Sequence, residues 1–236
     1  MNNYNFPPDE RMLGKTNEDK VHKVILRMLK ILSIICEQND IPFWLDYGTM
    51  LGAIRHKGFI PWDMEADIGI IRDDFLKLKD ILSESLPPDI FLQTKESDPD
   101  YLLSSYYIEA KLRDKYSNYS DFQKTNPNIK WHNGIQVDIF VYDIERLAEK
   151  ICLINEFEKI FTNVNSYLNF EEIEELVPMA FEDTFFYVPK GYDAYLIRNY
   201  GNYMELPSLS QRYTEAVDVF TPCRHKEILK WQNLNI

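Results

Sequence analysis

A chain of 236 residues with 45% hydrophobic and 14% aromatic residues can bury a sizeable core, which excludes an intrinsically disordered protein. Its formal net charge of −12 argues against a nucleic-acid partner, because phosphate backbones are bound through clustered lysine and arginine. The three cysteines are isolated and form no Cys-x-x-Cys pair, which argues against a structural zinc site and a disulfide framework.

The N-terminal region shows no apolar core of the kind that signal peptides contain. The first twenty residues are polar, and the most apolar segment, residues 21–36, is interrupted by three basic residues. We therefore expect a soluble, cytoplasmic protein with no signal peptide and no membrane span. Residues 1–18 contain paired prolines and many charges and are predicted to form a flexible arm. Residues 19–236 are predicted to form a single catalytic domain.

Hydrophobic periodicity predicts an alternation of helices and strands. Apolar residues spaced by three and four positions predict an amphipathic helix over 19–38. A short strand at 41–46 follows, and Gly48-Thr49 then turns the chain into a helical stretch that ends before Gly58. Further helices are predicted at 73–85, 144–161, 170–177 and 190–200, and further strands at 66–71, 90–94, 102–112, 135–142 and 184–188. The polar residues 114–134 are predicted to form a loop.

The segment from Trp44 to Ile70 has the most informative functional pattern. A Gly-Thr turn and a basic triplet precede three carboxylates on alternate positions, Asp63, Glu65 and Asp67. Residues two apart on an extended strand share one face, so these carboxylates would repel one another unless a cation lay among them. Hard divalent cations take oxygen ligands, usually one or two carboxylates together with substrate phosphates. The pattern predicts metal-assisted phosphate chemistry, although a solvated acidic loop is the simpler alternative.

Asp138 is a single charge inside an apolar strand, where an unpaired carboxylate is costly to bury. It could lie on an edge strand and face water. Alternatively, an antiparallel neighbour could bring it beside Glu65 and Asp67, so that the three side chains share one ion. In that arrangement Asp138 could also act as the general base for an attacking hydroxyl.

These segments together resemble the LicD family, which includes bacterial phosphocholine transferases and fukutin-type phosphosugar transferases. The motifs that carry the resemblance are EQNDIPFWLDYGT at 37–49, GTMLGAIRHKGFIPWD at 48–63, AKLRDK at 110–115, GIQVDIFVYD at 134–143 and the block at 181–207. The resemblance implies an α+β nucleotidyltransferase fold, in which a mixed β-sheet core is flanked by helices and has helical N- and C-terminal additions.

The resemblance also implies an activity. A phosphorylated group (phosphocholine, a phospho-sugar or a phospho-alditol) would pass from a CDP-linked donor to a glycan hydroxyl, with release of CMP and with Mg²⁺ or Mn²⁺ as cofactor. Matched by position, Glu65 and Asp67 would bind the metal, Asp138 would be the third carboxylate, and Asp63 would match a further acidic position. The residues implied to bind substrate or its phosphates are Tyr47, Gly48, Thr49, Arg55 and Lys57.

Two alternatives stay open beside this interpretation. The family usually carries Asp where this chain has Glu65, so the chain could be a weakened or inactive homologue that binds a nucleotide or glycan without transfer. A nucleotidyltransferase that releases pyrophosphate would use the same fold, although the IPWD and VDIF segments favour the LicD type. The transferred group, the acceptor glycan and the oligomeric state are left open by the sequence.

Overall fold

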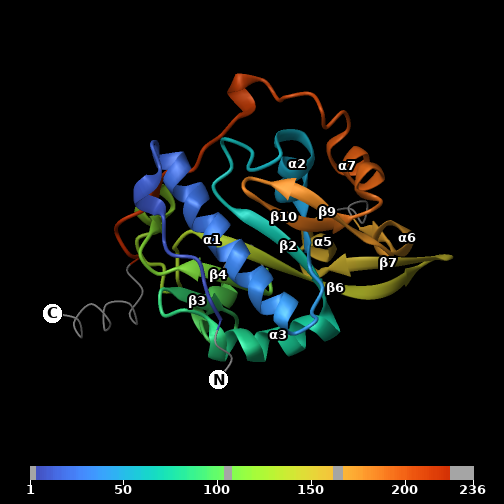
Figure 1. Cartoon of the computed structure of the whole chain (residues 1–236), viewed down its shortest axis with the longest axis horizontal. Coiled ribbons are helices and arrows are strands. Elements are labelled where there is room, and N and C mark those ends of the chain that lie inside the picture. Colours follow the sequence, from blue (N-terminus) through green and yellow to red (C-terminus); the bar gives the residue numbers. More distant parts are fainter. Residues whose placement is uncertain (1–3, 104–107, 162–166, 224–236) are drawn as a thin grey trace.

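The computed structural model describes residues 4–103, 108–161 and 167–223, and a mixed β-sheet lies at its centre (Figure 1). The strands of this sheet are β1 (Trp44–Leu45), β2 (Ala66–Ile71), β3 (Ile90–Gln93), β4 (Ala110–Asp114), β6 (Gln136–Leu147), β7 (Lys150–Asn155) and β8 (Leu168–Asn169). Their order is β1–β2–β6–β4–β3. In addition, β7 pairs with β6, and β8 pairs with β7. β2 and β6 run parallel, whereas the other neighbouring pairs are antiparallel. This mixed sheet with its flanking helices confirms the predicted α+β fold.

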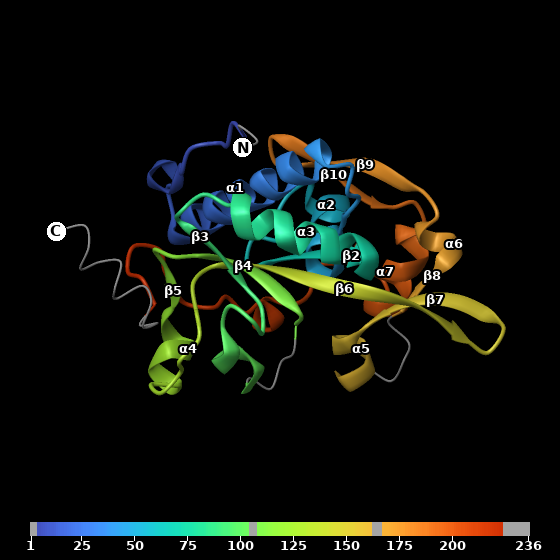
Figure 2. The same ribbon diagram turned by 90° about the horizontal axis from the view of Figure 1, so that it is seen from below.

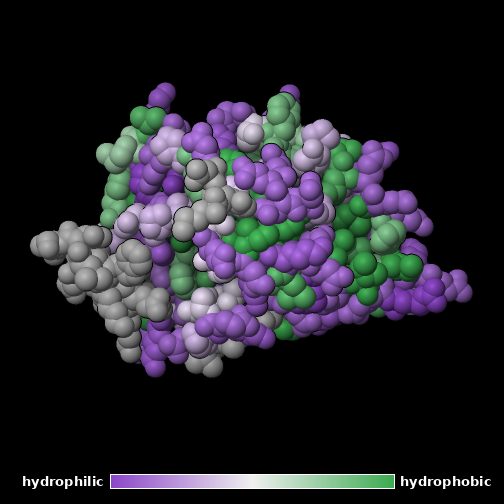
Figure 3. Space-filling view, turned by 60° about the horizontal axis from the view of Figure 1, so that its bottom comes forward, coloured by the Kyte–Doolittle hydropathy of each residue, from purple (hydrophilic) through white to green (hydrophobic). Residues whose placement is uncertain are grey.

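Two helices, α1 (Asn17–Gln38) and α3 (Arg72–Ser85), cover one face of the sheet, the upper face in Figure 2. α1 begins at a capping box, in which the Thr16 hydroxyl accepts from the Asp19 N–H and the Asp19 carboxylate accepts from the Thr16 N–H. Its apolar residues recur every three or four positions and are buried in the main hydrophobic core, as the periodicity predicts. The outer surface on this side is mainly hydrophilic, with hydrophobic groups in smaller patches (Figure 3).

The short helices α4 (Ser120–Thr125) and α5 (Glu156–Phe161) lie on the opposite side of the sheet, below it in Figure 2. Just before α4, the strand β5 (Asn118–Tyr119) pairs with β11 (Val217–Asp218). This pairing brings the C-terminal part of the chain beside residues that precede it by about a hundred positions. The functional residues described below come from this side of the sheet.

The remaining elements surround the sheet. They are the 3-10 helices η1 (Arg11–Leu13), η2 (Pro99–Leu103) and η3 (Leu209–Gln211), the helices α2 (Tyr47–His56), α6 (Phe170–Ile173) and α7 (Tyr192–Tyr200), and the antiparallel hairpin of β9 (Leu176–Phe181) and β10 (Thr184–Pro189). Within the described ranges, none of the helices has the length and apolar character that a membrane-spanning segment requires.

The N-terminal segment contacts the domain through Arg11. This side chain is buried, and its Nη2 atom lies 2.6 Å from the Asp114 carboxylate at the end of β4. Its Nη1 atom donates a hydrogen bond of 2.7 Å to the carbonyl oxygen of Val219. Arg11 therefore joins the residues before α1 to both β4 and the C-terminal segment.

The structure corrects several predicted elements. The helix predicted at 144–161 is wrong: β6 continues to Leu147, turns at Ala148 (φ 54°) and returns as β7, and only α5 is helical. Alternating exposure along β6 after Tyr142 shows a period of two, and pairing with β7 outweighs the helix propensity of its charged residues. The strand predicted at 102–112 is wrong at its start, because η2 extends to Leu103; residues 104–107 lie outside the described ranges.

Three further predictions differ in extent. The strand predicted at 41–46 comprises only β1, and the helix predicted at 170–177 ends at Ile173 because β9 begins at Leu176. The loop predicted at 114–134 contains β5 and α4. β1 and β5 pair with strands from other parts of the chain, β2 and β11, and local periodicity carries no information about such pairing.

Candidate active site

Three charged residues form a row across neighbouring strands of the sheet. Asp67 on β2 is paired in register with Asp138 on β6, and Asp138 is paired with Lys111 on β4. Residues directly paired across strands project from the same face, so the three side chains lie side by side. Because β6 has β2 on one side and β4 on the other, the edge-strand interpretation of Asp138 is wrong. The antiparallel neighbour expected for it is also wrong, since β2 and β6 run parallel.

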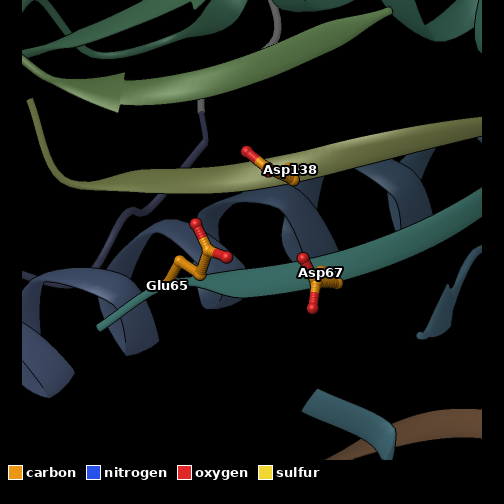
Figure 4. Close-up of side chains that lie close together, drawn as sticks. All are labelled: Glu65, Asp67 and Asp138. Carbon is orange, nitrogen blue, oxygen red and sulfur yellow. The ribbon is translucent and has the colours of Figure 1, made fainter. Parts of the chain in front are cut away.

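Glu65, Asp67 and Asp138 form a carboxylate cluster in which one oxygen from each side chain lies within 4.8 Å of the others. Figure 4 shows Glu65 and Asp67 on one segment and Asp138 on the neighbouring strand. β2 begins only at Ala66, so Asp67 lies on the strand, whereas Asp63 and Glu65 lie on the segment that precedes it. The three carboxylates therefore do not alternate along one strand as expected. Asp63 lies close by, but it is outside this group of three.

The ionised forms of Asp63, Glu65 and Asp67 are disfavoured in the metal-free protein. Burial raises the pKa of Glu65, and the charge of Asp138 adds to the effect. Burial likewise raises the pKa of Asp67, with a further contribution from Glu65, and it raises the pKa of Asp63 to about 6. A divalent cation among the side chains would favour their ionised forms instead.

The residues present fit such a cation. Oδ1 of Asp138 is buried and lies 2.8 Å from Nζ of Lys111, so one lysine side chain faces a cluster of three carboxylates. Gly48 leaves room on the other side: a Cβ atom at this position would lie 3.0 Å from Asp63 Oδ2 and 3.8 Å from Asp67 Oδ2. Carboxylate oxygens are the ligands of hard ions such as Mg²⁺ and Mn²⁺. The cluster therefore has the chemistry of a divalent-cation site.

Hydrogen bonds connect the turn before α2 to the start of β2. Thr49 is buried, and its Oγ1 atom accepts a hydrogen bond of 2.7 Å from the backbone N–H of Asp67. The Asp46 N–H donates to the Asp67 carbonyl (3.0 Å), and Asp46 is the N-cap of α2. Tyr47 has a positive φ of 39°, a conformation that non-glycine residues rarely adopt. Thr49 thus holds Asp67 in place, whereas Tyr47 and Gly48 border the cavity described below.

A cavity of about 690 Å³ opens over the carboxylate cluster. Charged residues lining it are Asp63, Glu65, Asp67, Lys111, Arg113, Asp138 and Glu215. Aromatic residues lining it are Tyr47, Tyr101, Tyr119, Phe122, Trp131, Phe140, Phe157 and Tyr200. Its walls include residues of η2, α4, α5 and the end of α7, together with Glu215. Parts of the chain that are far apart in sequence therefore meet around the carboxylate cluster. Its volume is typical of a small-molecule site.

Arg55 and Lys57, the basic residues expected to bind phosphate, lie at the other end of α2. Nη1 of Arg55 donates a hydrogen bond of 2.8 Å to the carbonyl oxygen of Tyr203. Lys57 caps α2 in the left-handed conformation, and its carbonyl accepts from the N–H of Glu182 (2.9 Å). Neither side chain is among the residues that line the cavity.

The basic residues that do line the cavity, Lys111 and Arg113, were not assigned from the sequence. Nζ of Lys111 lies 2.8 Å from Oδ1 and 2.9 Å from Oδ2 of Asp138, and 3.2 Å from Oε1 of Gln136. Arg113 donates to Gln93 Oε1 (2.8 Å) and to the carbonyl of Gly134 (2.8 Å). A signal was present: both are charges on alternate positions at the end of a predicted strand, and they therefore project from the same face of β4.

Gln136 links this basic side to the carboxylates. Its Nε2 atom donates to Oε2 of Glu65 and, at 3.3 Å, to Oδ2 of Asp138. Gln136 precedes Asp138 by two positions on β6 and therefore projects from the same face. The side-chain amide thus bridges two members of the cluster and also accepts from Lys111.

A buried polar network lies behind Tyr47. The Tyr47 hydroxyl donates to Glu158 (3.0 Å), and Asn155 Nδ2 donates to the same hydroxyl (2.9 Å). Asp46 accepts from the hydroxyls of Tyr142 (2.7 Å) and Tyr195 (3.2 Å). Burial raises the pKa of Glu158 to about 8, and repulsion from Asp46 adds to this effect.

We expect the pKa of Glu158 to make stability pH-dependent. Between about pH 4.5 and 8 the folded protein retains a proton that the unfolded chain has lost, so the free energy of unfolding falls as pH rises through this window. Glu158→Gln removes this contribution, on the order of a few kcal/mol. Urea unfolding from pH 5 to 8.5 should therefore show a shallower decline for Glu158→Gln. The exposed Glu149→Gln serves as control, and equal slopes in all three proteins would contradict the prediction.

A mixed sheet with carboxylates from two parallel strands, beside a glycine-containing turn that opens a helix, is consistent with a nucleotidyltransferase-like fold. Residues 40–191 match the family described as LicD/FKTN/FKRP, nucleotidyltransferase domain. The chain therefore belongs to the LicD family, as its motifs indicate.

Curated relatives with stated activities support this assignment. The chain is 32% identical over 121 residues to the lipopolysaccharide cholinephosphotransferase LicD of Haemophilus influenzae, which is 51% of this chain and 42% of that protein. It is 42% identical over 40 residues to the human ribitol 5-phosphate transferase FKRP, 17% of this chain and 8% of that protein. It is 25% identical over 115 residues to the mouse ribitol-5-phosphate transferase FKTN, 49% of this chain and 20% of that protein. The chain thus spans less than half the length of these relatives.

Proposed function

We propose that this chain transfers a phosphorylated group from a CDP-linked donor to a glycan hydroxyl and releases CMP, with a divalent cation as cofactor. The observation that carries the proposal is the carboxylate cluster of Glu65, Asp67 and Asp138 at the floor of the aromatic-walled cavity. The names of the relatives agree with it, because they describe transferases of phosphocholine and of ribitol phosphate.

Glu65, Asp67 and Asp138 would hold the cation, with Asp63 close by. When bound, a Mg²⁺ or Mn²⁺ ion polarises phosphoryl oxygens and offsets the charge that develops on a leaving nucleotide. Glu65 is one methylene longer than aspartate, yet its carboxylate lies within the same cluster. We therefore propose that the substitution leaves the site competent.

The protein's own residues would orient the reacting groups. The acceptor hydroxyl oxygen forms a new bond to the phosphorus of the transferred group, its proton passes to Asp138, and the bond to CMP breaks with the electron pair on the CMP oxygen. Asp138 suits this role only as a carboxylate, and the buried Lys111 is its partner charge. Lys111 and Arg113 add positive charge to the cavity, and Tyr47 and Gly48 border it. Binding of more distant phosphate oxygens by Arg55 and Lys57 stays a prediction.

We propose phosphocholine as the transferred group, on the basis of the aromatic residues and the additional carboxylate in the cavity lining. Phe122, Trp131 and Tyr101 present aromatic side chains, and Glu215 adds a carboxylate from the C-terminal segment. Aromatic faces beside a negative charge bind a quaternary ammonium group, whereas a polyol needs convergent hydrogen-bonding partners. Glu215 lies outside the family match, so this part of the cavity belongs to the chain's own C-terminal segment.

Product analysis tests the proposal against its two alternatives. The protein would be incubated with CDP-choline, CDP-ribitol or CTP, each with Mg²⁺ and with EDTA, and the nucleotide products would be separated by chromatography. We expect CMP from a CDP-linked compound in the presence of Mg²⁺ only, with water as a slow substitute acceptor. Pyrophosphate from CTP would indicate a nucleotidyltransferase. Donor binding without any product, independent of metal, would indicate an inactive homologue.

A further inference from the structure

The segment that carries Asp63 and Glu65 lies before the strand pairing of the sheet begins. The first residue of β2 is Ala66, and the register with β6 also starts there, so the parallel pairing includes Asp67 but not residues 63–65. Figure 4 shows Glu65 where the chain enters β2. Strand pairing restrains the backbone and the direction in which each side chain projects. Other contacts must therefore hold Glu65 in the carboxylate cluster.

Side chains from two other elements hold the backbone of this segment. The Tyr119 hydroxyl on β5 donates a hydrogen bond of 2.8 Å to the carbonyl oxygen of Met64. Nε2 of His22 on α1 lies 2.7 Å from the carbonyl oxygen of Asp63, and because a carbonyl oxygen only accepts, this nitrogen donates. The two consecutive carbonyls directly before Glu65 are thus bound by side chains from distant parts of the chain.

Tyr119 is itself held in place. It is 4% exposed, and it is one of the residues that line the cavity. Its backbone N–H donates to the carbonyl of Asn133 (3.0 Å), and Asn133 Nδ2 donates to the Tyr119 carbonyl (3.1 Å). In the pairing of β5 with β11, Val217 is the partner of Tyr119. A buried hydroxyl on a backbone fixed in this way restrains the carbonyl to which it donates.

The His22 ring is fixed by stacking. Its centroid lies 4.4 Å from that of the Phe59 ring, and the two planes are 10° apart. Phe59 is buried and belongs to the segment that leads from α2 to β2. His22 therefore contacts this connecting segment twice, through the Phe59 ring and through the Asp63 carbonyl.

The position of the Glu65 carboxylate depends on its backbone more than that of an aspartate would. The glutamate side chain has one more rotatable bond, so its carboxylate can take more positions unless it is held. Gln136 Nε2 donates to one of its oxygens, Oε2, from the neighbouring strand. The backbone before Glu65 is held through the Met64 carbonyl. Together these contacts restrain both ends of a flexible side chain.

We infer that Tyr119 and His22 are positioning residues for the metal site. By holding the backbone of residues 63–65, they keep the Glu65 carboxylate within reach of the cation. The inference rests on the proposed metal site and assigns two residues that act on it without touching the ion. Tyr119 has the larger effect, because its hydroxyl binds the carbonyl of the peptide group that joins Met64 to Glu65.

Mn²⁺ titration followed by electron paramagnetic resonance tests the inference, because it measures the free ion without donor or acceptor. Tyr119→Phe removes only the hydroxyl, and we expect the Kd for Mn²⁺ to rise about tenfold or more, the loss typical of residues that orient metal ligands. His22→Phe keeps a ring beside Phe59 but removes the N–H, and it should also raise the Kd. Tyr203→Phe is the matched control: it removes a buried hydroxyl that donates to Asp193 (2.5 Å) and does not line the cavity, so the Kd should be unchanged.

A second background shows whether Tyr119 acts through Glu65. Glu65→Gln keeps two anionic ligands, and in this background Tyr119→Phe should change the Kd by less than about twofold. An equal loss of affinity in both backgrounds would assign the effect to the fold as a whole and overturn the inference. If Glu65→Gln binds too weakly to titrate, the comparison with Tyr203→Phe decides.

An unchanged Kd for a folded Tyr119→Phe variant, beside a wild type that binds Mn²⁺, would overturn the inference and leave the proposed function standing. No Mn²⁺ binding by the wild type would refute both. Circular dichroism and thermal unfolding establish whether each variant is folded. If Tyr119→Phe does not fold, His22→Phe decides by the same criterion.

Discussion

Replacing Asp67 with asparagine is expected to lower transfer by about a thousandfold or more while leaving the protein folded. Asp67 is a member of the carboxylate cluster, and the amide cannot replace an anionic ligand of a hard cation. The hydrogen bond from its backbone N–H to Thr49 is unaffected by the change. The variant should therefore lose Mn²⁺ binding and turnover together.

The same substitution should not reduce the stability of the metal-free protein. Burial and neighbouring carboxylates raise the pKa of Asp67, which means that its charge is unfavourable in the absence of a cation. Above neutral pH, Asp67→Asn should unfold at the same or a higher temperature than metal-free wild type. Asp73→Asn, at an exposed position at the start of α3, controls for a general effect of charge. A near wild-type rate for Asp67→Asn would refute the metal assignment.

The second large effect is expected for Asp138→Asn, which should reduce kcat by about a hundredfold to ten-thousandfold, the range of general-base catalysis. An asparagine can still accept a hydrogen bond from Lys111 but cannot accept the proton of the acceptor hydroxyl. We expect the donor KM to change much less than kcat. Steady-state kinetics at varied donor concentration separate the two quantities.

Stability has to be measured beside those kinetics, because Asp138→Asn leaves the buried Lys111 without a compensating charge. Loss of one partner of a buried ion pair typically costs about 3–5 kcal/mol. Asp143→Asn is a suitable control: it is on the same strand, and its carboxylate pairs with Arg72 at a partly exposed position. Equal losses in kcat and in donor affinity for Asp138→Asn would contradict the role as base.

The sequence predicted the parts of the site that depend on short-range pattern. β2 and the start of β6 are recognisable as apolar strands, and Asp67 and Asp138 are conspicuous because each interrupts such a strand. Their in-register pairing could not be read from the sequence, since it depends on β2 and β6 lying parallel at the centre of the sheet. The partner of Asp138 was missed for the same reason: Lys111 reaches it across strands.

Two other features show where local reasoning stops. Tyr200, at the end of α7, and Glu215, just before β11, both line the cavity. The β5–β11 pairing joins strands that are about a hundred residues apart in the chain. Arg55 was assigned to phosphate because the family resemblance matches it by position. It follows Gly48 by seven residues, which on an α-helix is about two turns or ~10 Å along the axis. The helix thus places Tyr47 and Gly48 at the cavity and carries Arg55 to its other end.

Calorimetric titration of CDP, CDP-choline and CDP-ribitol, with Mg²⁺ or Mn²⁺ and then with EDTA, tests the central claim most directly. We expect that a cytidine diphosphate compound binds only when the divalent cation is present, and that CDP-choline binds most tightly. Failure of every cytidine nucleotide to bind under both conditions would contradict the assignment of this cavity to a CDP-linked donor.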